Sequence, residues 1–103
     1  MEPFRLEPGR QRGSFRLVGE LDIANVAVVQ VRLEEELGDA GTLILDASDL
    51  EFMDSQGLQM LIHLGEQAEN RRETVHLVNC SRQVQRLLAI AVPDGIPGVD
   101  IKG

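Results

Sequence analysis

The stretch Leu50-Glu51-Phe52-Met53-Asp54-Ser55-Gln56-Gly57-Leu58 contains the junction that decides the fold. After Asp54, apolar residues recur at helical spacing. A short carboxylate side chain can accept hydrogen bonds from the free N–H groups at a helix start, so we predict that Asp54 is a helix N-cap. One face of this helix would pack against the core, and the members of that face are Leu58, Leu61, Ile62, Gly65 and Ala68.

Met60 and Leu64 form a second apolar pair on the same predicted helix, one turn apart. A wide core-facing surface could include both side chains. Alternatively, the pair fills a partner's groove beside Gln56, because methionine adapts its shape to a binding surface. Under this second interpretation, Met60→Glu would weaken partner binding and leave the fold intact.

Three segments before the junction have the patterns of strands. Residues 4–7 and 14–18 alternate apolar and polar side chains, and the loop between them, 8–13, contains Pro and Gly. Residues 42–45 form a short apolar run, which is typical of a strand buried in the middle of a sheet.

The segment 23–37 mixes β-branched residues, which favour strands, with an apolar stripe at helical spacing. We interpret it as a helix. Asp22 or Asn25 could cap its start, and Gly38 suits the left-handed position just past its end.

The second half of the chain continues the alternation of strands and helices. Residues 74–78 alternate like a strand, Ser81 can cap a third helix, and Pro93 would end that helix. The tail, 94–103, could add one short strand. The predicted order is therefore β-β-α-β-α-β-α with a possible C-terminal strand, which makes an α/β fold with a mixed sheet packed against helices.

Length and charge limit the possible functions. The 103 residues, 1–103, allow one domain of ordinary composition. The net charge of -7 repels phosphate backbones, so nucleic acid is not expected as a partner. No segment has the roughly 20 apolar residues that cross a bilayer or the apolar stretch of a secretory signal, so we expect a cytoplasmic protein with no membrane insertion.

The residues that could carry catalysis are few and scattered. His63 and His76 are isolated, and Ser55 has no evident general base. Cys80 is the only cysteine and has no zinc-ligand spacing, so we interpret it as a small buried residue. We therefore expect a protein that is not an enzyme and has no metal or cofactor.

Two segments together point to a family. Gly19-Glu20-Leu21-Asp22 and the junction stretch, at their spacing, resemble the STAS domains of anti-sigma-factor antagonists, in which a G-E-x-D turn leads into the first helix and an F-M-D-S-S-G-L stretch opens the second. The resemblance covers about residues 4–90. It implies a STAS-like fold and a partner that is an anti-sigma factor with an ATPase-type serine kinase fold, whose capture frees a sigma factor for transcription.

Gln56 departs from the family pattern at the position that matters for regulation. In that family the second serine of D-S-S-G is phosphorylated by the partner kinase. Gln56 occupies this position, and its amide cannot accept the phosphoryl group. One interpretation is an antagonist that is not switched at this position, with Gln56 supplying neutral hydrogen bonds. Another moves the phosphate to Ser55, although neighbouring helical residues point about 100° apart.

Two further functions remain open. A STAS domain also serves as the regulatory subunit of membrane transporter ATPase complexes, and fold alone does not decide function. A nucleotide- or small-molecule-binding module is the alternative from another class, although no phosphate loop is present. Calorimetry with ATP and GTP would test it.

The partner-binding surface is expected around the two motifs. The resemblance implies that Glu20 and Asp22 lie near the start of the second helix, where the other candidate contacts are Asp54, Ser55, Gln56, Gly57, Met60 and Leu64. With Asp49, the carboxylates would form one acidic surface, and a basic partner would then bind in a salt-sensitive way.

Overall fold

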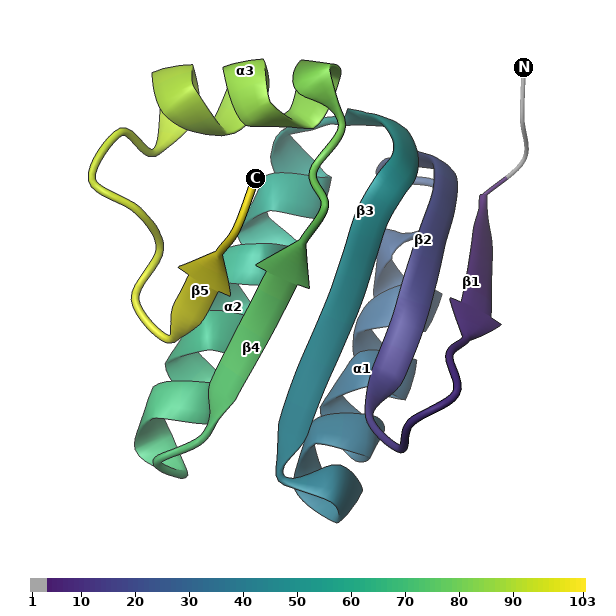
Figure 1. Ribbon diagram of the computed structural model, residues 1–103, viewed down its shortest axis with the longest axis vertical. Helices are drawn as coiled ribbons and strands as arrows, with labels where there is room; N and C mark the ends of the chain where they lie inside the picture. Colours follow the sequence, from purple (N-terminus) through teal and green to yellow (C-terminus); the bar gives the residue numbers. More distant parts are fainter. Residues whose placement is uncertain (1–3) are drawn as a thin grey trace.

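The computed structural model describes residues 4–103, and its elements follow the predicted order, with the C-terminal strand present (Figure 1). In chain order they are β1 Arg5–Pro8, β2 Ser14–Leu21, α1 Val26–Ala40, β3 Thr42–Met53, α2 Ser55–Asn70, β4 Thr74–Val78, α3 Arg82–Ala91 and β5 Val99–Ile101.

The five strands form one mixed sheet in the order β1-β2-β3-β4-β5. β1 pairs antiparallel with β2, and every later pair is parallel. Parallel neighbours need crossover connections, which α1, α2 and α3 supply. The predicted α/β class with a mixed sheet is therefore confirmed.

The helices occupy two places around the sheet. Figure 1 shows α1 and α2 side by side behind the sheet and α3 across the end at which β4 finishes. The side chains enclosed between the sheet and the helices form the core. Its fully buried large members are Leu17, Leu21, Leu33, Leu37, Leu43, Leu45, Leu50, Met53, Met60, Leu61, Leu64 and Leu77.

β3 is much longer than the apolar run 42–45 from which we predicted it. It continues to Met53 because β2 also continues, to Leu21, and the two strands pair over nearly their whole length. The pairing register shifts twice, and Ala47, Leu50 and Met53 turn inward at every third position. These irregularities hide the period of two that identifies a strand in sequence.

The ends of α1 differ from the prediction. Gly38 lies inside the helix, and the left-handed residue past its end is Gly41, with φ 78° and its N–H donating to the carbonyl of Leu37. Asn25 occupies the N-cap position but makes no side-chain cap hydrogen bond. Of the two residues expected to cap the helix, Asn25 therefore takes the N-cap position, but its side chain bonds no N–H of the first turn.

Candidate functional site

Asp54 is the N-cap of α2, as predicted. Its Oδ1 accepts hydrogen bonds from the N–H groups of Gln56 at 2.9 Å and Gly57 at 3.0 Å. Its Oδ2 accepts the N–H of Ile23 at 3.1 Å, and its own N–H donates to the carbonyl of Leu21. Asp54 therefore joins two regions to the start of α2: the end of β2, through its backbone N–H, and the loop after β2, through its carboxylate.

Two side chains, from Asp22 in the G-E-x-D turn and from Asn25 just after it, bond to the backbone of this segment. The Asn25 amide nitrogen donates to the carbonyl of Glu20 at 2.9 Å, and its oxygen accepts the N–H of Asp22 at 3.1 Å. Asp22 in turn accepts the N–H of Ala24 at 2.9 Å, a local turn bond instead of a helix cap. Sequence reasoning missed this role of Asn25, because the residue type equally suits an N-cap.

Gly57 lies where only a glycine fits. A Cβ at this position would stand 2.6 Å from the Cγ of Met53 and 2.9 Å from the carbonyl oxygen of Leu21. The first turn of α2 therefore sits directly on the ends of β2 and β3. Gly57 is buried, so its part in the site is to allow this close approach, and its side of the helix is not open to a partner.

Ser55 and Gln56 are exposed at this helix start, while Asp54 is half-buried. Two large apolar side chains flank them in the open: Phe52 is 50% exposed and Ile23 is 72% exposed. Phe52 lies beside Glu20 in the pairing of β2 with β3. The two motifs therefore meet in space, as the resemblance to the family implied.

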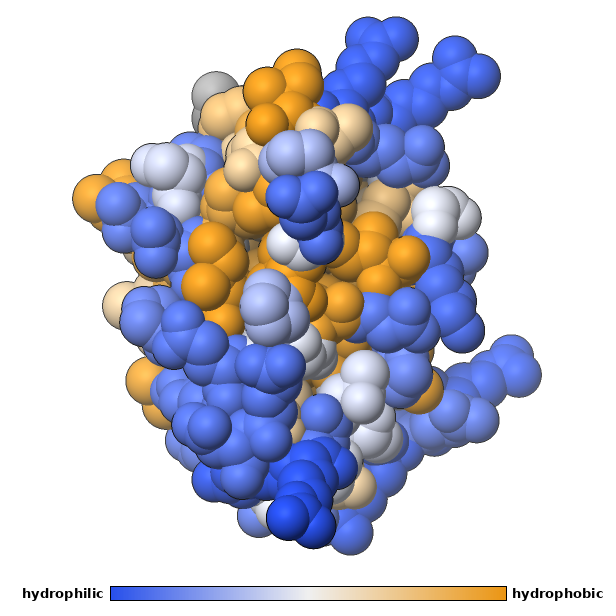
Figure 2. Space-filling model, turned by 90° about the vertical axis from the view of Figure 1, so that its left-hand side faces the viewer, coloured by the Kyte–Doolittle hydropathy of each residue, from blue (hydrophilic) through white to orange (hydrophobic). Residues whose placement is uncertain are grey.

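Met60 and Leu64 are not surface residues. They are 1% and 0% exposed and belong to the core, so the interpretation that they fill a partner's groove is wrong. The helix is rotated relative to the predicted stripe: Leu58 and Ile62, expected inside, are only partly buried. Figure 2 shows apolar surface on this side of the molecule, where α2, α3 and β5 lie.

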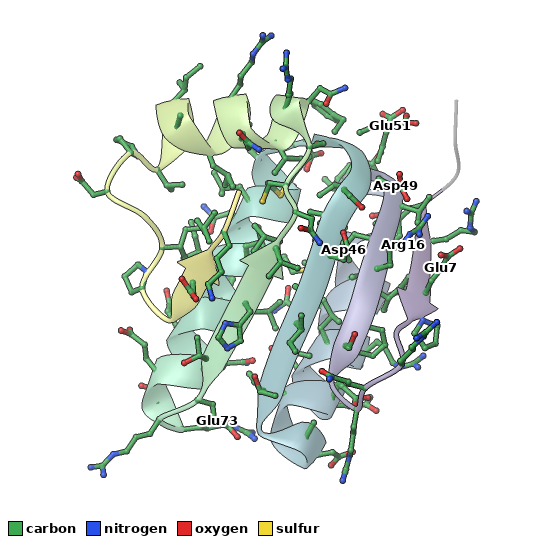
Figure 3. The ribbon with its side chains drawn as sticks, in the orientation of Figure 1. Glu7, Arg16, Asp46, Asp49, Glu51 and Glu73 are labelled. Atoms are coloured by element: carbon green, nitrogen blue, oxygen red, sulfur yellow. The ribbon has the colours of Figure 1, made fainter. Side chains whose placement is uncertain are left out.

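Asp49 is separated electrostatically from the other carboxylates. The Arg16 guanidinium pairs with Asp49 and lies 3.7 Å from Glu7, on the outer face of the sheet (Figure 3). A polar hollow of about 330 Å³ adjoins this pair, with Ser81 at its edge. Because Arg16 pairs with Asp49, this carboxylate would contribute less negative charge to the expected acidic surface than Glu20, Asp22 and Asp54.

Among the titrating groups of residues 4–103, two have pKa values off their ordinary ones, and both lie outside the motif surface. Burial raises the pKa of Asp46, but hydrogen bonds from Ser48 and Asn79 and the charge of Arg16 outweigh it, so the pKa lies below its ordinary value. Burial raises the pKa of the Cys80 thiol above 9.0. A thiol that stays protonated is a poor nucleophile, which agrees with a structural role.

Within residues 4–103, no three His, Cys, Asp or Glu side chains gather closely enough to hold a metal ion. No helix of this part of the chain is long and apolar enough to cross a bilayer.

The family model described as the Mlab STAS domain matches residues 4–98. The chain therefore belongs to the STAS domain family. A comparison with curated proteins gave no match.

Solved structures share this fold at low sequence identity. A putative anti-sigma factor antagonist from Thermotoga maritima matches with TM-score 0.75 and 23% identity, over 97% of this chain and 86% of that one. The anti-sigma factor antagonist SpoIIAA in its unphosphorylated form matches with TM-score 0.67 and 23% identity, over 94% and 86%. The murine anion transporter Slc26a9 matches with TM-score 0.62 and 23% identity, over 88% of this chain but 16% of the transporter. At these identities the likeness shows the fold alone.

Proposed function

We propose that this chain is an anti-sigma-factor antagonist. It sequesters an anti-sigma factor with an ATPase-type serine kinase fold and so regulates sigma-factor-dependent transcription. The observation that carries the proposal is the start of α2, where Ser55 and Gln56 are exposed beside the G-E-x-D turn and the Asp54 carboxylate holds the two motifs together. A partner can reach this surface without any rearrangement of the fold.

Gln56 makes the proposed antagonist insensitive to phosphorylation at its own position. Its side chain is neutral and offers both an amide donor and a carbonyl acceptor to a partner. A phosphate at the same place would bring a charge of about -1.5 to -2 into the interface, with its desolvation cost. Phosphorylation at position 56 would therefore never switch off binding of the anti-sigma factor to this protein.

Ser55 is the remaining hydroxyl at the helix start, and its phosphorylation is a second possible means of regulation. It is exposed, and the two N–H groups of the first turn are already taken by Asp54. Mass spectrometry after incubation with the kinase, beside a control antagonist that is modified under the same conditions, tests this directly. An unmodified Ser55 would leave this chain without that switch.

The second candidate function is a regulatory subunit of a membrane transporter ATPase complex. It is supported by the likeness to part of the Slc26a9 anion transporter, which indicates that a domain of this fold can belong to a transport protein. Such a partner could use the same exposed start of α2.

Affinity purification from the native cell, using the wild-type chain and Gln56→Glu as baits, decides between these functions. Gln56→Glu keeps the size of the side chain and adds one charge, so we expect it to recover at least about tenfold less anti-sigma kinase. Gln83→Glu, an equal change at an exposed position on α3, is the matched control and should recover as much as wild type. Recovery of a transporter ATPase without any kinase would replace the first function with the second.

A further inference from the structure

The start of α1 carries an exposed apolar surface that the function proposed above does not use. Val28 is 77% exposed and Val31 is 55% exposed, and with Ile23 they are three of the five exposed large apolar residues within 4–103. Ala24 and Ala27 are exposed as well. We call Ala24, Ala27, Val28 and Val31 the α1 patch; their spacing places them on one side of the helix and of the turn before it.

A groove runs beside the α1 patch, between α1 and the edge strand β1. It has a volume of about 380 Å³ and is lined mostly by apolar side chains, with Phe4 and Leu6 on the opposite side from Val28 and Val29. The lining runs from Ala24, in the turn before α1, to Arg32, and its helical part from Val28 to Arg32 spans about 6 Å, roughly one turn. A groove lined by apolar side chains from both elements suits the apolar face of a helical segment.

The charges around the groove favour a basic occupant. Among the described residues, Arg32 is the only cation that lines it, and its guanidinium lies over the ring of Phe15 at 5.6 Å, so it already has a partner. On α1 and in the turn before it, the other charged residues beside the α1 patch are acidic: Asp22 before the helix and Glu35, Glu36 and Asp39 in its second half. A segment with lysine or arginine beside its apolar side chains would complement them.

A second copy of this chain fits the groove poorly. Two α1 helices packed antiparallel, with Val28 of each against Val31 of the other, would set the acidic second half of each helix beside the Glu20–Asp22 turn of the other copy. Each copy also carries a net charge of -7. Like charges facing each other oppose such a pairing.

We propose that the groove between α1 and β1 docks a basic amphipathic helix of the partner protein. The proposal rests on the proposed function, because it assigns a second contact to the same partner. The two contacts are continuous: Ile23, just before the α1 patch, is bonded through its N–H to Asp54 at the start of α2. The partner would therefore meet both the start of α2 and the outer side of α1.

Paired substitutions at one exposed position test the surface and the charge of its occupant. Val28→Glu and Val28→Lys should both weaken binding of the purified partner by roughly tenfold or more, and Lys should weaken it further because the docked helix is basic. Ile90→Lys, at an 82% exposed position on α3, is the control and should bind like wild type. Both Val28 variants should unfold in urea at the wild-type midpoint, since the side chain lies in solvent.

The outcomes separate this proposal from the proposed function. If Gln56→Glu weakens binding and neither Val28 variant does, the groove proposal is wrong and the function stands. If Val28→Lys binds better than Val28→Glu, the occupant is not basic. Dimerisation of the protein alone in sedimentation velocity, abolished by Val28→Glu, would show that a second copy occupies the groove and would overturn the proposal.

A synthetic probe tests the groove without any cellular partner. We expect an amphipathic leucine–lysine helical peptide to shift the backbone amide resonances of Leu6 and Val28 in a saturable way, and a leucine–glutamate peptide to leave them unchanged. Equal shifts with both peptides, or none with either, would contradict the proposal while leaving the function of the α2 start intact.

Discussion

The carboxylate of Asp54 accepts the backbone N–H of Ile23 at 3.1 Å, across 31 residues of sequence. The same carboxylate caps α2 through its other oxygen. The Asp54 side chain therefore holds both the loop before α1 and the first turn of α2. A structural change at one of these places would alter the position of the other.

Removing this carboxylate should cost stability. Asp54→Ala leaves the N–H groups of Gln56, Gly57 and Ile23 without their acceptor, and we expect the free energy of unfolding to fall by about 1–2 kcal/mol. Asp54→Asn keeps one side-chain oxygen and should lose less. Urea unfolding measures both, and an Asp54→Ala variant as stable as wild type would show that the cap contributes nothing.

Two helical glycines should respond oppositely to alanine. Gly57→Ala pushes a methyl group against Met53 and the Leu21 carbonyl, so we expect a loss of about 1–3 kcal/mol. Gly38→Ala meets only the tip of the Arg71 side chain, which can move, and alanine is the better helix former by up to about 1 kcal/mol. Thermal or urea unfolding compares them, and similar losses in both would contradict the tight packing at Gly57.

Met60 provides a test of which side of α2 faces the core. Met60→Ala should lower the free energy of unfolding by about 2–5 kcal/mol, because it leaves a cavity in a closely packed interior. Gln59→Ala, its exposed neighbour, should stay within about 0.5 kcal/mol of wild type. A stable Met60→Ala variant that had merely lost partner binding would return Met60 to the surface.

Stability should fall in acid partly because of Asp46. Its pKa lies below 3.8 in the folded protein, so the carboxylate contributes stability above that ordinary value and loses it as the pH falls through the folded one. Asp46→Asn cannot titrate, and its unfolding free energy should change less than that of wild type below about pH 4. Parallel pH profiles for the two proteins would contradict this account.

Features that depend on neighbours in sequence could be predicted well. Asp54 and Ser81 were both identified as caps, and Ser81 does accept the N–H of Val84, in addition to donating to the carbonyl of Leu50. The order of strands and helices along the chain, with a possible strand in the tail where β5 lies, also follows from local patterns. The order of the strands within the sheet was not predicted.

The rotation of α2 could not be found from its apolar residues alone. Two stripes two residues apart, through Leu58 and Ile62 or through Met60 and Leu64, both have helical spacing. Gly57 was the available signal, because it lies on the buried side with Met60 and Leu64, whereas Gly65 belongs to the predicted and to the observed face. The exposure of Val28 and Val31 depends on which elements pack against α1, and no local sequence pattern encodes that packing.

The contact at Gly57 also has a consequence for recognition. A helix start whose glycine packs directly on two strand ends has almost no room to shift when another molecule presses against it. Its outward groups would be held in their bound arrangement before any encounter, so association would lose little conformational freedom on this side. The adjustment needed to form a complex would then fall mainly on the other molecule.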